Sequence, residues 1–176
     1  MPDPDVGGSA PRQEAPSAVV RFQRPTLDDG AAMWRIARDS KTLDLNTSYA
    51  YLLWARDFAA NSVVATVDGE PAGFVTGYRR PDEPSTLMVW QVAVDERHRG
   101  HGLARRMLDE LADRGQGAIT HLETTITEDN TASVALFTSF ANGREAHLER
   151  TPLFEAPLFP DGHDTEFLFR IGPFQT

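Results

Sequence analysis

The fold is decided by residues 92–108, which read VAVDERHRGHGLARRML. The apolar run 87–94 leads into them and is typical of a central strand buried on both faces of a sheet. Gly100 and Gly102 lie in the loop that follows, and an amphipathic helix is predicted over about 102–114. Glycines let a backbone approach a ligand closely, and the free N–H groups at a helix start favour anions. The order of strand, glycine loop and helix therefore predicts an anion-binding turn.

This turn is locally basic although the chain is acidic. Asp and Glu total 26 against 17 for Lys and Arg, which gives a formal net charge of −9. The basic residues in and beside the turn are Arg97, Arg99, Arg105 and Arg106. The alternative is a purely structural glycine turn whose arginines face solvent. The strand before the turn and the helix after it favour a bound anion instead, and a pyrophosphate fits best. Neither Gly-x-Gly-x-x-Gly nor a Walker lysine is present, since Lys41 is the only lysine.

Length and composition narrow the possible functions. The 176 residues suit one domain with a proper core, and 40% apolar with 24% charged residues is an ordinary globular balance. The acidic net charge argues against duplex nucleic acid or an anionic membrane as the main partner. No apolar run approaches the ~18 residues of a membrane span, and we expect a cytoplasmic protein. The chain has no cysteine, which excludes disulfides, thiolate nucleophiles and Cys-based metal sites.

The pattern along the chain predicts a disordered arm at 1–18, rich in Pro, Gly and Asp, followed by a single domain at 19–176. Asp68-Gly69 is a strong hairpin signal between two strand-like segments. Strands are predicted at 19–22, 62–67, 73–78, 87–94, 120–127 and 167–171. Helices are predicted from an N-cap at Thr26 through 31–37, and at 48–59, 102–114 and 131–140. This order predicts an α+β fold with a mixed sheet.

Two motifs carry a family resemblance. The first is Val92-x-Val94 followed by Arg97-x-x-Gly100-x-Gly102. The second is Asn130-x-x-Ser133-x-x-Leu136-Phe137, which opens the next predicted helix. Together they resemble the acetyl-CoA-binding motifs of the GNAT N-acetyltransferase superfamily. The resemblance implies the GNAT fold, an α+β architecture in which helices flank a mixed, mostly antiparallel sheet with splayed central strands.

The same resemblance implies which residues hold acetyl-CoA. The splayed strand offers backbone groups to the pantetheine arm, and one strand N–H polarises the thioester carbonyl. The loop binds the pyrophosphate through backbone N–H groups. The expected cofactor residues are Val92, Ala93, Val94, Arg97, Arg99, Gly100, His101, Gly102, Leu103, Ala104, Asn130, Ser133 and Phe137. Asn130 has a second interpretation as a helix N-cap, and the two roles are compatible.

Four further segments resemble one group of enzymes within that superfamily. They are 44–53 (DLNTSYAYLL), 90–94 (WQVAV), 123–127 (ETTIT) and 168–173 (LFRIGP). They are similar to the L-2,4-diaminobutyrate acetyltransferases of ectoine biosynthesis, which implies acetyl transfer from acetyl-CoA to the 4-amino group of this diamino acid. The alternatives are an acetyltransferase of another amine, such as a polyamine or a protein N-terminus, and a non-catalytic acyl-CoA-binding sensor. The resemblance also implies a homodimer, for which the apolar C-terminal strands at Leu153-Phe154 and Leu158-Phe159 are the expected contact surface.

A diamino acid needs acidic and aromatic groups around its ammoniums. Asp44 lies between two leucines, where a carboxylate either caps a helix or binds a cation. Tyr49 and Trp90 can form cation–π contacts with an amine, and core packing is the alternative for Trp90. His163 and Glu166 lie three positions apart before the last strand, where they either turn a loop or return polar groups to the pocket.

Catalysis needs a base for the ammonium, whose pKa is near ~10.4, and an acid for the leaving thiolate. The base candidates are Asp44, His163, Glu166 and Glu123, and the sequence does not rank them. Many family members carry a tyrosine as the acid where this chain has Phe137, which leaves Tyr49, water or no specific donor. Without cysteine, direct transfer in a ternary complex is expected. No metal is expected, because His98-x-x-His101 has metal-like spacing but no further ligand nearby.

Overall fold

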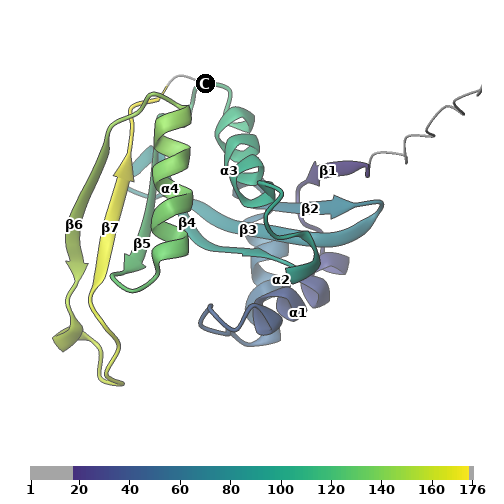
Figure 1. Ribbon diagram of the computed structural model, residues 1–176, viewed down its shortest axis with the longest axis horizontal. Coiled ribbons are helices and arrows are strands. Elements are labelled where there is room, and N and C mark those ends of the chain that lie inside the picture. Colours follow the sequence, from purple (N-terminus) through teal and green to yellow (C-terminus); the bar gives the residue numbers. More distant parts are fainter. Residues whose placement is uncertain (1–17, 175–176) are drawn as a thin grey trace, which may run out of the picture.

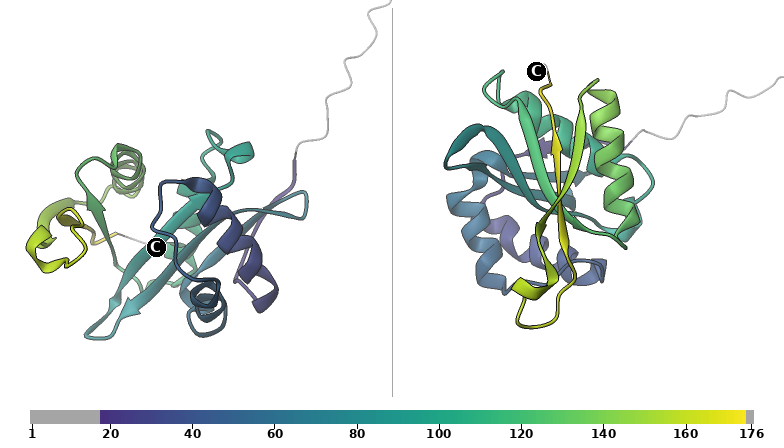
Figure 2. Two further views of the ribbon diagram at one scale, coloured as in Figure 1. Left: turned by 90° about the horizontal axis from the view of Figure 1, so that it is seen from below. Right: turned by 90° about the vertical axis from the view of Figure 1, so that its left-hand side faces the viewer.

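The computed structural model describes residues 18–174, so the arm predicted at 1–18 lies outside the described residues except for its last position. Within these residues, seven strands form one sheet and four α-helices cover its faces (Figures 1 and 2). The strands are β1 (Val20–Gln23), β2 (Val63–Val67), β3 (Glu70–Arg80), β4 (Glu83–Val94), β5 (His121–Thr127), β6 (Leu148–Phe154) and β7 (Glu166–Ile171). The helices are α1 (Gly30–Ser40), α2 (Ser48–Asp57), α3 (Leu103–Arg114) and α4 (Thr131–Gly143).

The sheet has the order β1-β2-β3-β4-β5-β7-β6, and each neighbouring pair is antiparallel except β4 with β5. Successive side chains of a strand point to opposite faces. Val63 and Val75 accordingly pack with α3 and α4, whereas Val64 and Phe74 pack with α1 and α2. The mixed, mostly antiparallel α+β sheet flanked by helices is therefore confirmed.

The parallel pair β4–β5 is hydrogen-bonded over only a short stretch. Thr86–Met88 is in register with His121–Glu123. Beyond this stretch, β4 continues to Val94 and β5 to Thr127, but the two strands no longer pair with each other. The strands diverge into a V-shaped opening (Figure 1). This geometry confirms the splayed central strands and separates the β1–β4 half of the sheet from the β5–β7 half.

A β-bulge lies just beyond the point where β5 leaves β4. Thr76 is opposite Gln91 and Gly77 is opposite Val89, so Trp90 has no partner on β3. The prediction that this strand is buried on both faces is wrong at Trp90, which is 53% exposed. The bulge is the physical reason, because it takes this residue out of the regular alternation of the strand.

The C-terminal part differs most from the prediction. Beyond its last two residues, β6 was not predicted, because its sequence LERTPLF contains a proline and lacks a clear alternation. Pro152 is tolerated because β6 is the edge strand, paired only with β7. Leu158 belongs to a 3-10 turn at Ala156–Leu158, so its assignment to a strand is wrong.

Candidate active site

The free edge of β4 offers backbone hydrogen-bonding groups to the opening. The N–H of Asp95 donates to the Ala72 carbonyl at 2.8 Å, and Val94 is opposite Gly73 in the register. The direction of hydrogen bonding alternates along an antiparallel strand. The N–H and C=O groups of Val92 and Val94 therefore point away from β3 and into the opening, as a strand-like ligand requires.

The loop between β4 and α3 has a backbone conformation that glycine adopts readily. Gly100 has a φ of +80° and Gly102 a φ of +68°, both in the left-handed region. A Cβ atom on either residue would meet nothing within 4 Å, so conformation rather than packing of the protein itself requires glycine here. Gly102 is the N-cap residue of α3, whose first N–H groups have no partner within the helix. These groups are available to an anion, as the pyrophosphate prediction requires.

Asp95 holds the start of this loop. It is 7% exposed and accepts hydrogen bonds from Nε and Nη2 of Arg97, both at 2.9 Å, and from Nη1 of Arg35 at 3.0 Å. The hydrogen bonds from Arg97 lower the pKa of Asp95 far below its ordinary value, and the one from Arg35 adds to the effect. Arg99 Nε donates to the carbonyl of Val94 at 3.1 Å. One of the outward-facing carbonyls of β4 is thus covered by Arg99.

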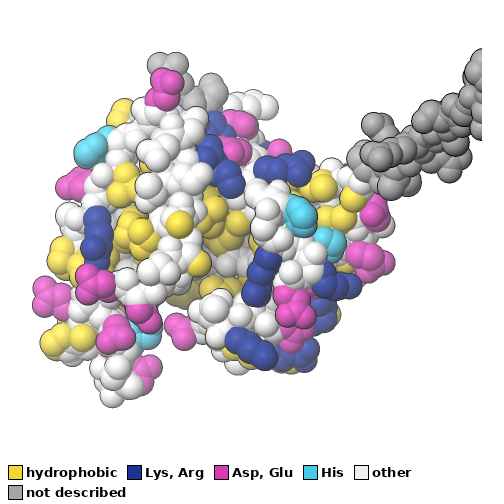
Figure 3. Space-filling view, in the orientation of Figure 1, with side chains coloured by type: hydrophobic (Ala, Val, Ile, Leu, Met, Phe, Trp, Pro, Cys, Tyr) yellow, Lys and Arg dark blue, Asp and Glu magenta, His cyan; other side chains and the backbone are white. Residues whose placement is uncertain are grey.

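The other two arginines near the loop make structural contacts. Arg105 of α3 donates to Asp109 at 2.8 Å and also to the backbone carbonyl of Ser139 in α4, so its side chain joins the two helices. Arg106 lies over the ring of Phe22, 5.1 Å from its centroid. Arg97 and Arg105 are each paired with an aspartate, so among the described residues Arg99 and Arg106 are the arginines of this group without an ion pair. Figure 3 shows the surface hollowed between the two halves of the sheet, with hydrophobic side chains in the hollow.

The second cofactor motif opens α4. Asn130 Oδ1 accepts a hydrogen bond from the Ser133 N–H at 3.1 Å, which confirms its role as an N-cap. Phe137 is 2% exposed and belongs to the core beneath the helix. Its ring fills space there and supplies no hydroxyl for proton transfer.

Three of the predicted substrate residues meet at one place. His163 Nε2 lies 3.5 Å from Asp44 Oδ2 and 3.7 Å from Glu166 Oε1. Asp44 comes from the loop before α2, and the other two come from the segment that enters β7. The Asp44 side chain is 93% exposed, and the N-cap of α2 is Thr47. The helix-capping alternative for Asp44 is therefore wrong. We call Asp44, His163 and Glu166 the acidic cluster.

His163 is oriented by its own loop. Nδ1 lies 2.8 Å from the backbone carbonyl of Asp164, an acceptor, so Nδ1 carries a hydrogen. Nε2 is then the nitrogen that gains or loses a proton, and it faces the two carboxylates. The hydrogen bond to Asp164 raises the pKa of His163, and the charges of Glu166 and Asp44 raise it further. The Phe159 ring covers the imidazole with its centroid 4.7 Å away.

Glu166 is the least solvated member of the acidic cluster. Its side chain is 18% exposed, and burial raises its pKa against the opposing effect of the Thr125 hydroxyl. Within the described part of the chain, its Oε2 atom is buried without a hydrogen-bond partner. A buried carboxylate oxygen without a donor costs free energy. An ammonium group would satisfy it in both charge and hydrogen bonding.

The two aromatic substrate candidates lie in different settings. Trp90 stands beside α2 with its ring 6.1 Å from that of Trp54, and its exposure rules out the core-packing alternative. Tyr49, in the first turn of α2, is 66% exposed. Among residues 18–174, Tyr49 makes no hydrogen bond to the acidic cluster. Its predicted contact with the substrate therefore stays a prediction, based on its position next to the Asp44 loop.

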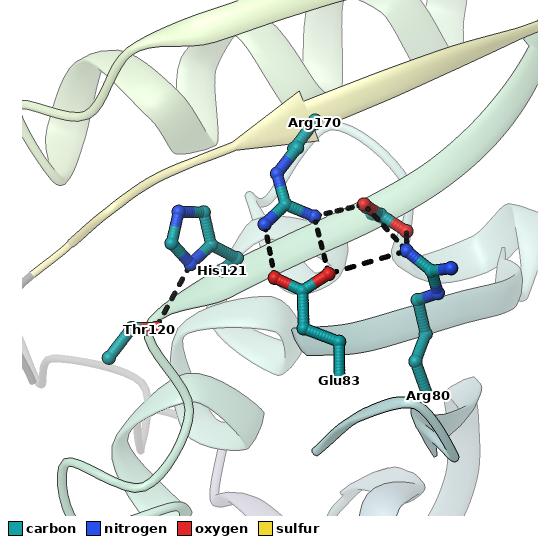
Figure 4. Close-up of polar contacts among 6 residues, drawn as sticks. Arg80, Glu83, Thr120, His121 and Arg170 are labelled. Atoms are coloured by element: carbon teal, nitrogen blue, oxygen red, sulfur yellow. Dashed lines mark hydrogen bonds and ion pairs between the residues drawn. The ribbon is translucent and has the colours of Figure 1, made fainter. Parts of the chain in front are cut away.

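Glu123, the remaining base candidate, is part of an ion-pair network whose members Arg80, Glu83 and Arg170 are labelled in Figure 4. It is 3% exposed and is paired with Arg170 of β7 and with Arg80 of β3, the latter at 3.2 Å. Glu83 at the start of β4 also pairs with Arg170. The network joins β3, β4, β5 and β7 at the closed end of the opening. Because two guanidinium groups occupy this carboxylate, we assign Glu123 a structural role.

Sequence reasoning missed two buried polar residues beside the acidic cluster. Gln91 is 7% exposed and donates from Nε2 to the backbone carbonyl of Asp44 at 2.9 Å. The hydroxyl of Tyr51, which is fully buried, donates to Gln91 Oε1 at 3.1 Å. A glutamine inside the apolar run 87–94 was the available signal, since a buried polar side chain needs a partner.

Comparison with known proteins agrees with this geometry. A model of the acetyltransferase (GNAT) family matches residues 30–141, which is more than half of the chain. The chain belongs to the GNAT acetyltransferase family. In this GNAT protein the matched region contains the β4 edge, the glycine loop and most of α4.

Several relatives of this GNAT protein share a single name. An L-2,4-diaminobutyric acid acetyltransferase of Streptomyces coelicolor is 61% identical over 163 residues, covering 90% of this chain and 96% of the relative. One of Halomonas elongata is 42% identical over 175 residues, covering 98% and 90%. The solved diaminobutyrate acetyltransferase EctA of Paenibacillus lautus, in complex with its substrate L-2,4-diaminobutyric acid and coenzyme A, has a TM-score of 0.85 at 37% identity and covers 91% of this chain and 98% of its own.

Among residues 18–174, no helix is both long enough and apolar enough to cross a membrane. No group of three or more His, Asp or Glu side chains there is placed to hold a metal ion.

Proposed function

We propose that this GNAT enzyme transfers the acetyl group of acetyl-CoA to the 4-amino group of L-2,4-diaminobutyrate, giving N4-acetyl-L-2,4-diaminobutyrate for ectoine biosynthesis. The observation that carries the proposal is the acidic cluster beside the opening of the sheet. Two carboxylates and a histidine form a site for a small cationic amine, and the buried Oε2 of Glu166 needs a donor. The names and coverage of the relatives support the same substrate.

Acetyl-CoA is assigned to the opening and the glycine loop. The outward N–H groups of Val92 and Val94 pair with the pantetheine arm, and one of them polarises the thioester carbonyl as negative charge develops on its oxygen. The backbone N–H groups at the start of α3 hold the pyrophosphate. Arg99 is placed to move from the Val94 carbonyl to a phosphate oxygen.

The acidic cluster is assigned to the diamino acid. Asp44 and Glu166 bind ammonium groups, and Trp90 adds a cation–π contact. His163 Nε2 takes the proton from the 4-ammonium, because Nδ1 keeps its hydrogen on the Asp164 carbonyl. The 4-amino nitrogen then attacks the thioester carbon, the C–N bond forms and the C–S bond breaks. Tyr49 or water gives a proton to the leaving thiolate, since Phe137 has no hydroxyl. The second proton of the attacking nitrogen, lost as the amide forms, restores that donor.

The proposal is tested by mass spectrometry of the product. Incubation with acetyl-CoA and L-2,4-diaminobutyrate should give one acetyl group, which fragmentation places on the 4-amino nitrogen. Asp44→Ala should lower kcat/KM for the diamino acid by about tenfold or more while leaving the KM for acetyl-CoA near the wild-type value. Acetylation of the 2-amino group, or of no amine at all, would contradict the proposed reaction.

We also propose that the enzyme is a cytoplasmic homodimer. The exposed apolar residues of the C-terminal segment supply the subunit contact: Leu153 at 42%, Phe154 at 45% and Leu158 at 67% exposure. Apolar side chains grouped in this way are typical of a protein contact surface. Light scattering of the wild type and of Leu158→Asp tests this assignment, because the charge should shift the species toward monomer. A monomeric wild type would contradict it.

A further inference from the structure

The β4 bulge places two consecutive side chains on the same face of the sheet. Neighbouring strand residues normally point to opposite faces, yet Trp90 packs near Trp54 of α2 and Gln91 binds Tyr51 of the same helix. The bulge at Trp90 accounts for this departure. One residue of the pair is thereby exposed in the substrate area, and the other is buried beneath it.

Gln91 connects the rigid strand to the loop that carries Asp44. Its amide is oriented by the Tyr51 hydroxyl, which donates to Oε1 at 3.1 Å, so that Nε2 is directed at the Asp44 carbonyl, 2.9 Å away. The loop is thus attached to β4 through its main chain, and Tyr51 of α2 orients the amide that makes this attachment.

This attachment matters because the Asp44 side chain has little other support. It is 93% exposed, and its contact in the acidic cluster is with His163 at 3.5 Å. A carboxylate on an otherwise free loop would sample many positions, and ordering it on substrate binding would cost conformational entropy. Holding the main chain of the loop lowers that cost before the substrate arrives.

We propose that Gln91 and Tyr51 are positioning residues which hold the Asp44 loop and thereby set the affinity for the diamino acid. They act through the main chain of Asp44 and touch neither the substrate nor acetyl-CoA. The inference rests on the proposed function, since it assumes that Asp44 binds an ammonium group of the substrate.

The test uses Gln91→Met, which keeps the length of the side chain and removes both hydrogen bonds, and Tyr51→Phe, which removes only the hydroxyl. In the full-length enzyme each should raise the KM for L-2,4-diaminobutyrate, by about tenfold for Gln91→Met and less for Tyr51→Phe. The values of kcat and of the KM for acetyl-CoA should stay within about twofold of wild type. Gln23→Glu, on the exposed part of β1, is the matched surface control and should change none of these values.

Measuring Gln91→Met in a variant that lacks the Asp44 charge distinguishes a positioning role from a general loss of structure. In Asp44→Asn, where the charge that Gln91 positions is absent, Gln91→Met should add little to the KM, because residues that act through one another are not additive. Hydrogen–deuterium exchange of residues 43–47 should also become faster in Gln91→Met. Equal effects with and without the Asp44 carboxylate, a proportional loss in kcat and both KM values, or unchanged exchange would overturn the proposal.

Different results would contradict the proposed function and the positioning role of Gln91 and Tyr51. If the wild type does not acetylate L-2,4-diaminobutyrate, the proposed function is wrong. If the wild type is active and Gln91→Met and Tyr51→Phe both keep its KM for the diamino acid, only the positioning role is wrong. Should Gln91→Met melt below the assay temperature, Tyr51→Phe decides the question, since it retains the buried ring.

Discussion

Asp95→Asn is the substitution that tests the glycine loop most informatively. The carboxylate caps the 3-10 turn Glu96–His98 through the Arg97 N–H at 3.2 Å and also binds the side chains of Arg97 and Arg35. Asparagine keeps the shape and one acceptor oxygen but loses the charge. Nothing else in the site changes, so the effect reports on how firmly this carboxylate holds the loop.

The expected loss of stability in Asp95→Asn depends on how far Asp95 and its two arginine partners are exposed to solvent. The Asp95 side chain is 6% exposed, whereas those of Arg97 and Arg35 are 65% and 38% exposed. Solvent screening around the arginines reduces the value of the ion pairs, so we expect a loss of about 2 kcal/mol in the free energy of unfolding. For a domain of this length each kcal/mol corresponds to about 2–4 °C, which gives a fall in Tm of about 4–8 °C.

The dependence on pH has a defined sign. The folded-state pKa of Asp95 lies below its ordinary value of 3.8, so its contribution to stability is present above that value. The contribution is lost as the pH falls below 3.8 toward the folded-state pKa. The difference in Tm between wild type and Asp95→Asn should therefore be constant from pH 5 to pH 8 and shrink in more acidic buffer.

The assay combines thermal unfolding with titration of coenzyme A by calorimetry. We expect the affinity for coenzyme A to fall by about tenfold, because the loop must be ordered again on binding, while the KM for the diamino acid at saturating acetyl-CoA stays near wild type. Glu96→Gln removes an exposed charge one residue away and is the matched control. Wild-type Tm together with wild-type coenzyme A affinity in Asp95→Asn would refute the assignment of Asp95 as the anchor of the loop.

Three further substitutions or conditions give sharp outcomes. Gly100→Val puts a β-branched residue at a φ of +80° and should cost about 1–3 kcal/mol and abolish measurable coenzyme A binding; unchanged affinity would remove the loop from the cofactor site. Glu123→Gln removes the buried carboxylate of the network and leaves Arg80 and Arg170 paired with Glu83. It should lower Tm by about 4–8 °C with kcat at 25 °C retained, whereas a folded variant with a hundredfold lower kcat would make Glu123 the base. Because the pKa of His163 is raised above 6.5, kcat/KM for the diamino acid should rise with pH through that raised value. The stability that the charged imidazole contributes is lost as the pH rises through the same pKa. The Tm of His163→Gln should therefore lie further below that of the wild type at pH 6 than at pH 9. A kcat/KM that does not change with pH would exclude His163 as the base.

Local signals in the sequence were sufficient for most of the fold. The hairpin around Asp68-Gly69, the apolar run into the glycine loop and the helix that follows are each set by residues adjacent in the chain. The predicted strands and helices fall within a few residues of the observed ones. The C-terminal strand β6 escaped prediction because an edge strand needs neither regular alternation nor freedom from proline.

The candidate site was only partly predictable, for a physical reason. Asp44, His163 and Glu166 were selected by chemistry and resemblance, but their meeting is a property of tertiary structure. The exposure of Trp90 depends on a bulge that no local pattern in the strand announces. Gln91 stands out as a polar residue in an apolar run, but its two partners, the Asp44 carbonyl and the Tyr51 hydroxyl, are set by tertiary structure.

Release of free thiol from acetyl-CoA is the most direct measurement of the proposed activity, because a chain with no cysteine adds no thiol of its own. The panel is L-2,4-diaminobutyrate against ornithine, lysine, spermidine and a peptide amine, with kcat/KM determined for each. The proposed function predicts that L-2,4-diaminobutyrate has the highest kcat/KM, by at least about tenfold, because the proposal assigns the acidic cluster to a small diamino acid. A higher value for another amine would contradict the assignment of substrate, and binding of acetyl-CoA without thiol release for any amine would contradict catalysis itself.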